Sequence, residues 1–193
     1  MPAPSPLSVL LAQIRTVLYS AGRHIMSQAQ PLIEQAYTLL DKEDPGCPQT
    51  ALHDSDLAFS VARMLELTTD KAFISFGLGV LINLGPMGEI LCVSFLRRTE
   101  LPKQTTFAIV ARMPRHKLLQ LVNRILANPK DTPDWLQDWA FSLIQETIKD
   151  DPEDVLLFLE TLDQRGLPLS YPMQRELMRS RFGVWLNQLL RLD

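Results

Sequence analysis

The chain is poor in the residues that cross-link a fold or bind metals, with two cysteines and three histidines among 193 residues. Cys47 and Cys92 are far apart in sequence and form no CxxC pair, which argues against a disulfide scaffold and a dithiol motif. His24 and His116 have no Cys, His or Asp at ligand spacing, which argues against a metal site. No glycine-rich stretch carries the Lys-Ser/Thr of a phosphate loop. We therefore expect no cofactor.

Candidates for catalysis are few. His53 is followed by Asp54-Ser55-Asp56, which together hold the ingredients of acid–base chemistry. A helix that begins at Asp54 or Ser55 accounts for these residues as caps. Cys92 lies among apolar neighbours, where cysteine usually acts as a small buried hydrophobe. We therefore expect no enzyme, and the alternative is a small cytoplasmic hydrolase or transferase with an unrecognised site.

Composition is that of an ordinary globular protein, with 46% hydrophobic and 21% charged residues. The length is most simply a single domain spanning residues 1–193. No basic residue precedes the first apolar run, so we expect no signal peptide and a cytoplasmic location.

A period of two residues dominates the centre of the sequence. From Phe73 to Leu84 the even positions are large and apolar, whereas the odd positions are mostly small or polar. Such alternation is typical of a β-strand. The turn 85–88, with two glycines and a proline, then leads into a second strand from Glu89, and a loop at 100–104 leads into a third strand, 105–113. The pattern predicts a three-stranded antiparallel meander over about 73–113.

The same region has a membrane interpretation. Residues 72–96 carry one charged residue, Glu89, and are long enough to cross a bilayer. Four glycines and Pro86 lie within this stretch, and the alternation has no purpose in a lipid-facing helix. We therefore expect no membrane span.

Helices are predicted on both sides of the meander, over about 6–67 and 114–191. Before it, we expect a helix from Leu7, a second helix that begins at Pro31, a loop over 41–53 and a third helix capped by Asp54 or Ser55. After it, the predicted helix starts are Pro114, Thr132-Pro133, Asp151-Pro152 and Pro172, and the last helix extends to Leu190. The predicted fold class is α+β and mainly helical, with an all-α fold as the alternative.

The predicted sheet has one face of small residues, which either packs against a helix of the same chain or binds a partner. We prefer the helix. Trp135 is a candidate interface anchor, and two arginines of the last helix could meet phosphates. The candidate interaction surface comprises Gly77, Gly79, Ser94, Arg98, Arg112, Trp135, Arg175 and Arg179.

Charge is segregated along the chain. Residues 97–130 carry eight basic and one acidic residue, whereas residues 131–163 carry one basic and ten acidic residues. We expect the two blocks to pair within the fold, and the acidic residues to lie at helix N-termini, where the helix dipole favours them. The isoelectric point of about 5.6 argues against a nucleic-acid partner.

In composition and predicted outline, the chain is similar to bacterial secretion chaperones and adaptors. We therefore expect a non-enzymatic protein-interaction module that acts as an adaptor, chaperone or regulator, for example in a secretion or regulatory system. Its partner would be another protein or a second copy of the chain, because the edge strand at 73–84 lacks charged residues that discourage pairing. The alternative is a nucleic-acid-binding regulator that uses the arginine-rich last helix.

Overall fold

The computed structural model describes residues 5–20, 25–42, 48–98, 113–150 and 152–180. This part of the chain is all-α, with nine α-helices, one short 3-10 helix and no strand. It divides into two compact units, residues 1–110 and 111–193, which are described separately. The α-helices are Pro6–Tyr19 (α1), Ile25–Leu40 (α2), Pro48–Leu67 (α3), Lys71–Asn83 (α4), Gly85–Arg98 (α5), Arg115–Ala127 (α7), Asp134–Asp150 (α8), Pro152–Gln164 (α9) and Tyr171–Arg179 (α10).

The predicted α+β fold, with its antiparallel meander, is wrong, and the all-α alternative is confirmed in the described residues. The first predicted strand is helix α4 and the second lies within helix α5. The third predicted strand lies outside the described residues, except for the buried Met113.

The misleading feature is Gly77, which the alternating pattern placed on a small-residue face. Phe73, Ile74, Gly77, Leu78, Leu81 and Ile82 are all buried and recur at intervals of one, three and four residues. This recurrence is the period of a helix. Gly77 packs in a helix contact and therefore belongs with the buried apolar residues. The helical period of the buried residues is recognisable only if Gly77 is included among them.

Leu84 alone separates α4 from α5, and the predicted four-residue turn between two strands is absent. The Asp70 side chain caps α4 by accepting a hydrogen bond of 2.8 Å from the backbone N–H of Ala72. At the other end, Gly85 has a φ of 60°, which side-chain-bearing residues rarely adopt. Among the helices that the structure describes, none is both long and apolar enough to cross a membrane.

Helices α4 and α5 approach each other closely at Gly88. A Cβ atom built on Gly88 would lie 2.0 Å from the carbonyl oxygen of Leu81. On α4, a Cβ on Gly77 would lie 2.7 Å from Cδ2 of Leu65 on α3. The two glycines thus permit helix contacts that any larger side chain would push apart.

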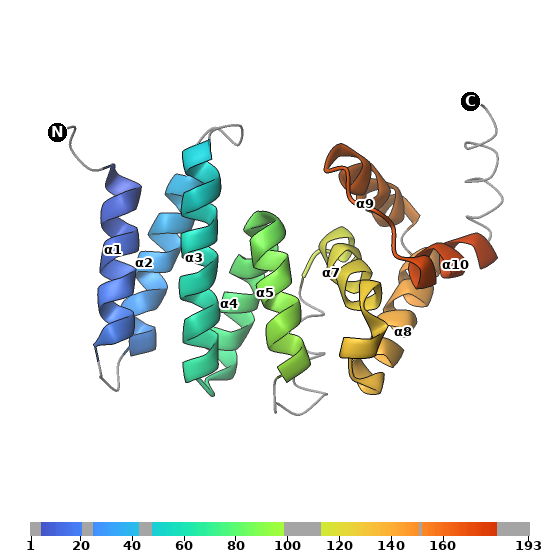
Figure 1. The fold of residues 1–193 in the computed structure, drawn as a ribbon, viewed down its shortest axis with the longest axis horizontal. Helices are drawn as coiled ribbons and strands as arrows, with labels where there is room; N and C mark the ends of the chain where they lie inside the picture. The colour runs from blue at the N-terminus through green and yellow to red at the C-terminus, as the bar shows by residue number, and fades with distance from the viewer. Residues whose placement is uncertain (1–4, 21–24, 43–47, 99–112, 151, 181–193) are drawn as a thin grey trace. The chain divides into compact units, whose positions relative to one another are not determined.

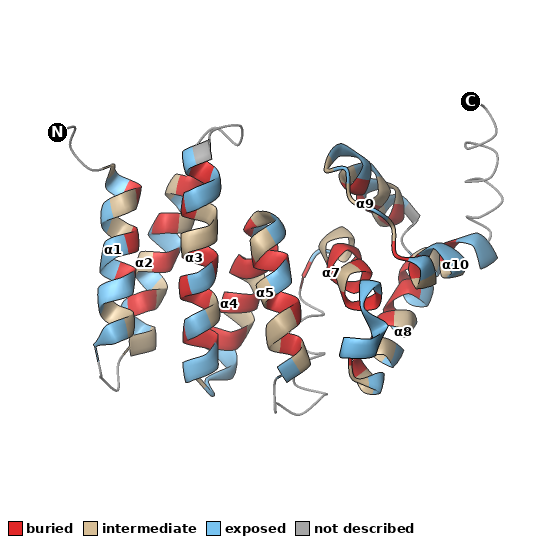
Figure 2. Cartoon of the chain, viewed as in Figure 1, coloured by how far each residue is buried: buried red, intermediate tan, exposed pale blue. Residues whose placement is uncertain are grey.

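Unit 1 is built from two layers of helices. Helices α1, α3 and α5 lie side by side in one layer, and α2 and α4 lie behind them (Figure 1). Figure 2 shows buried residues on the sides of these helices that face their neighbours. The centre of the core includes Ile14, Ile33, Leu57, Met64 and Leu81, each fully buried.

The helix boundaries of unit 1 agree with the sequence only in part. The first helix is confirmed, and its N-cap Ser5 accepts a hydrogen bond of 3.2 Å from the N–H of Ser8. Pro31 lies inside α2 and not at its start, so that prediction is wrong. Helix α3 begins at Pro48, which places Asp54 and Ser55 inside the helix, not at its cap.

In unit 2, helix α7 contacts α8, α9 and α10, and α8 also contacts α9 and α10. The four predicted helix starts are confirmed to within one or two residues, since the helices begin at Arg115, Asp134, Pro152 and Tyr171. A 3-10 turn, Pro129–Asp131, separates α7 from α8. The last helix is described as far as Arg179, and its predicted continuation to Leu190 lies outside the described residues.

Candidate interaction surface and polar cluster

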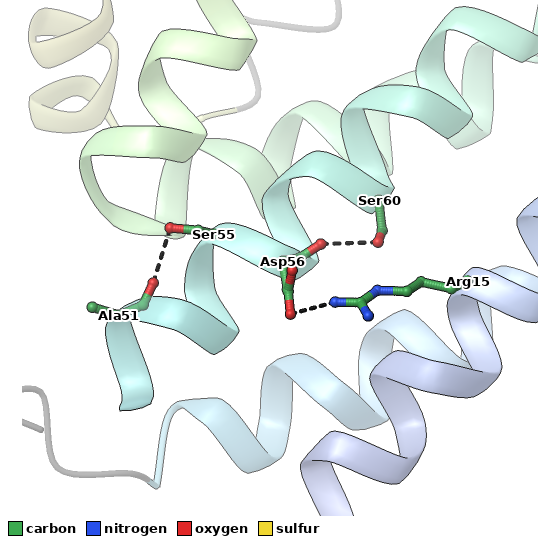
Figure 3. A network of polar contacts seen from close by, with 5 residues as sticks. All are labelled: Arg15, Ala51, Ser55, Asp56 and Ser60. Carbon is green, nitrogen blue, oxygen red and sulfur yellow. Dashed lines mark hydrogen bonds and ion pairs between the residues drawn. The ribbon is translucent and has the colours of Figure 1, made fainter. Parts of the chain in front are cut away.

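The acidic and hydroxyl residues of α3 make structural contacts. The Asp56 carboxylate accepts a hydrogen bond from the Arg15 guanidinium, which joins α3 to α1 (Figure 3). The Ser55 hydroxyl donates to the carbonyl of Ala51, and the Ser60 hydroxyl donates to the carbonyl of Asp56, each at 2.9 Å. Both hydroxyls are therefore held against the backbone one turn earlier and not against a base.

Cys92 is poorly suited to act as a nucleophile at neutral pH. Its side chain is fully buried on α5, and burial together with the nearby Glu89 raises the pKa of the thiol to about 12. The thiolate, which is the reactive form, is therefore scarce. His53 is buried as well, at 8% exposure. Within the described ranges no group of three His, Cys, Asp or Glu residues could hold a metal ion.

Large exposed apolar side chains gather on one layer of unit 1. Of the residues described there, all the large hydrophobic side chains that are exposed lie on α1, α3 and α5, and none lies on α2 or α4. Leu52 is 67% exposed and Phe59 is 53% exposed, seven residues apart on the same side of α3. We call these side chains the α1–α3–α5 face: Val9, Tyr19, Leu52, Phe59, Leu67 and Ile90.

Two residues of the predicted interaction surface adjoin this face on α5. Ser94 and Arg98 follow Ile90 at intervals of four residues, so the three lie on one side of the helix. Ile90 is 46% exposed, Ser94 is half-buried and Arg98 is exposed. The sequence grouped Ser94 and Arg98 on a sheet face, whereas the structure places both on the outer side of a helix.

The other residues of the predicted surface are dispersed. On α4, Gly77 is buried against Leu65, whereas a Cβ on Gly79 would meet nothing within 4 Å. Arg112 lies outside the described residues. In unit 2, Trp135 is half-buried on α8. Arg175 and Arg179 are exposed on α10, where both pair with Glu176, at 3.7 and 3.4 Å.

A groove of about 390 Å³ lies between α1 and α2. Its lining is apolar at Leu10, Pro31 and Leu39 and polar at Glu34, Gln35 and Thr38. The Glu34 carboxylate accepts a hydrogen bond of 3.0 Å from the Gln30 side chain, one turn earlier on α2. The groove therefore offers contact area, without a catalytic arrangement among these lining residues.

A buried polar cluster joins α7 to the connection between α9 and α10 in unit 2. The Asn123 side chain donates to the carbonyl of Pro168 at 3.1 Å and accepts from the N–H of Ser170 at 2.7 Å. One turn earlier on α7, the side-chain oxygen Oε1 of Gln120 accepts a hydrogen bond from the Arg165 guanidinium at 3.4 Å. We call Gln120, Asn123, Arg165 and Ser170 the α7–α10 polar cluster.

Sequence reasoning missed this cluster completely. Its hydrogen bonds join residues 45 to 47 positions apart. Neither Gln120 nor Asn123 has a distinctive neighbour in sequence, and both occupy positions on α7 that are at least 94% buried. A polar residue within the apolar period of a predicted helix was the only available signal.

The segregated charge is partly neutralised within unit 2, as predicted. Arg115 pairs with Glu146 at 2.9 Å, and His116 lies 3.4 Å from Asp154, so basic residues of α7 meet the acidic block. Asp134 lies in the first turn of α8, and Glu153 and Asp154 lie in the first turn of α9. The helix dipole accounts for these positions.

No protein-family model, no curated protein and no solved structure matches this chain.

Proposed function

We propose that the protein is a non-enzymatic interaction module, an adaptor, chaperone or regulator that binds another protein through the α1–α3–α5 face. The supporting observation is that, among the described residues of unit 1, the exposed large apolar side chains all lie on the helices of this one layer. Scattered single hydrophobic residues are normal on a protein surface, whereas their concentration on neighbouring helices of one layer favours a contact surface. Phe59 and Leu52 would be the anchors, since well-packed aromatic and aliphatic side chains carry much of the binding energy of an interface.

The chemistry of the described residues favours binding over catalysis. Cys92 is buried and protonated, and the hydroxyls of Ser55 and Ser60 bond to backbone carbonyls. Arg175 and Arg179 share the carboxylate of Glu176, which reduces the positive charge that a nucleic acid would meet on α10. These contacts support a protein partner over a nucleic acid.

Site-specific photo-crosslinking in the cell that makes the protein tests this proposal. A crosslinking amino acid at Phe59 should capture a defined partner, because this side chain is 53% exposed in the middle of the face. The matched control carries the same amino acid at Gln28, an exposed position on α2 in the other layer. Capture at Phe59 and not at Gln28 is the expected result.

Substitution then separates binding from unfolding. Phe59→Ser should weaken the complex at least tenfold, since truncation of an interface anchor costs about 2 kcal/mol or more. Far-UV circular dichroism should show an unchanged fold. Equal capture at both positions, or binding that survives Phe59→Ser, would place the partner elsewhere. Light scattering after size exclusion shows whether the captured partner is a second copy of the chain.

A further inference from the structure

The outer side of helix α3 carries a single row of residues. Five exposed or half-exposed residues recur there at intervals of three and four positions and so lie on one side of the helix: Leu52, Asp56, Phe59, Arg63 and Leu67. We call these residues the α3 stripe. Intervals of three and four positions are also the spacing at which two helices pack along each other. The α3 stripe is therefore suited to contact a second helix lengthwise.

The order of residue types along the α3 stripe is the same from both ends, except that the charge changes sign. Phe59 lies near the centre, with Asp56 three residues before it and Arg63 four residues after it. The leucines form the ends, with Leu52 seven residues before Phe59 and Leu67 eight residues after it. An antiparallel copy of the stripe would place each leucine opposite the other leucine, and each aspartate opposite an arginine. The stripe is thus complementary to itself in charge and in the positions of its apolar residues.

Both charged residues of the α3 stripe already contact an opposite charge in their own chain. Asp56 pairs with Arg15 of α1 (Figure 3), and Arg63 pairs with Glu66 at 2.7 Å. The Asp56 and Arg63 side chains nevertheless remain 45% and 63% exposed. A carboxylate offers two acceptor oxygens and a guanidinium offers several N–H donors, so each group can bind a second partner. In an antiparallel pair of stripes, the charges would alternate from Arg15 and Asp56 of one copy to Arg63 and Glu66 of the other.

Helix α5 adds an exposed apolar side chain at the level of Phe59. Helices α1, α3 and α5 run in the same direction (Figure 1). A Cβ atom on Gly85 would lie 3.3 Å from Oδ2 of Asp54, so these two residues of α5 and α3 lie side by side. Phe59 and Ile90 each follow five residues later, which places them at one level along the two helices. A two-fold axis that crosses the layer at this level would bring both side chains against their own copies.

We propose that the partner bound by the α1–α3–α5 face is a second copy of the chain, with α3 of one copy antiparallel to α3 of the other. This inference rests on the proposed function, because it names the occupant of the same face. The dimer is isologous, and its two-fold axis passes beside Phe59. Charge fixes the direction of the helices. A parallel arrangement would set Asp56 against Asp56 and Arg63 against Arg63, and like-charge repulsion opposes it.

Exchange of charge between two variants tests the antiparallel pairing. Asp56→Arg leaves arginine at both charged positions of the stripe, and Arg63→Asp leaves aspartate at both. Each variant alone should dimerise about tenfold more weakly or worse, because like charges then face each other across the interface. An equimolar mixture of the two variants should recover the wild-type affinity, since every arginine then faces an aspartate. Analytical ultracentrifugation measures the affinities, and native mass spectrometry shows whether each recovered dimer contains one copy of each variant.

The charge substitutions should leave the fold of the chain intact. The ion pairs that Asp56 and Arg63 make within the chain are exposed, and such pairs contribute little to stability. Far-UV circular dichroism checks the fold, and recovery of the dimer in the mixture also requires that both variants are folded. The matched control is Glu34→Arg on α2, which makes the same change in charge in the other layer and should dimerise as the wild type does.

Three results would overturn the proposal: a wild-type chain that remains monomeric, dimers that persist in both single variants, or a mixture that does not recover the wild-type affinity. Failure of the proposed function is a separate result. If the wild-type chain is monomeric while crosslinking at Phe59 captures a different protein, the α1–α3–α5 face is still a binding surface and only the dimer is wrong. If the chain is monomeric and crosslinking at Phe59 captures nothing, both proposals are wrong.

Discussion

Replacing Gly88 with alanine should destabilise unit 1, whereas replacing Gly79 with alanine should stabilise it. The new Cβ at position 88 would lie 2.0 Å from the Leu81 carbonyl oxygen, where ordinary contact begins near 3.4 Å. Backbone cannot rotate away as a side chain can, so α4 and α5 must separate. The Cβ at position 79 would meet no atom within 4 Å.

The two effects have opposite signs and can be estimated. Overpacking a well-packed contact costs about 1–3 kcal/mol, and an immobile backbone atom favours the upper end. At either position, the higher helix propensity of alanine over glycine stabilises the helix by up to about 1 kcal/mol. Gly88→Ala should therefore lower the free energy of unfolding by about 2 kcal/mol, or the Tm by roughly 4–8 °C if all 193 residues unfold together. Gly79→Ala should raise that free energy by about 0.5–1 kcal/mol.

Urea unfolding followed by far-UV circular dichroism measures both changes. The three tryptophans, at positions 135, 139 and 185, all belong to unit 2, so their fluorescence reports on that unit alone. If the chain is one cooperative domain, as its length predicts, Gly88→Ala moves the two transitions together. Stabilisation by Gly88→Ala, or equal effects of the two substitutions, would refute the helix crossing at Gly88.

The remaining predictions concern Asn123 and Cys92. Asn123→Leu should destabilise unit 2 by about 2–4 kcal/mol, because it leaves the Pro168 carbonyl and the Ser170 N–H unpaired. Tryptophan fluorescence in urea measures this change. The control Ser170→Ala keeps the backbone N–H and should destabilise unit 2 far less, and equal destabilisation by the two variants would contradict the role of Asn123. In a Cys47→Ser variant, Cys92 should react with thiol reagents only after unfolding. Because its pKa is raised to about 12, the folded state holds the thiol proton more tightly than the unfolded state does. The resulting stability is fully present below the unfolded pKa of about 8.5. Above that pH it is lost by about 1.4 kcal/mol per pH unit until the folded pKa is reached. If the stability of the protein relative to Cys92→Ala did not change between about pH 9 and 11, the raised pKa of Cys92 would be contradicted.

Local signals in the sequence determined much of unit 2. A proline lies at or beside the start of each of α7, α8, α9 and α10, and α8 and α9 carry acidic residues in their first turns. These residues act through fixed φ angles and the helix dipole. These effects need no tertiary partner, so their positions could be predicted. The burial of Cys92 was predicted as well, because its neighbours are apolar in either secondary structure.

Tertiary structure alone decided the identity of α4 and α5. An apolar run with interspersed glycines fits a strand if the glycines form a small face, and it fits a helix if they form a contact. Gly77 and Gly88 lie in helix–helix contacts, because Leu65 of α3 approaches Gly77 and Leu81 of α4 approaches Gly88. The α7–α10 polar cluster was beyond prediction for a related reason. Its hydrogen bonds join residues more than 40 positions apart, and only the packing of α7 against the α9–α10 connection brings those residues together.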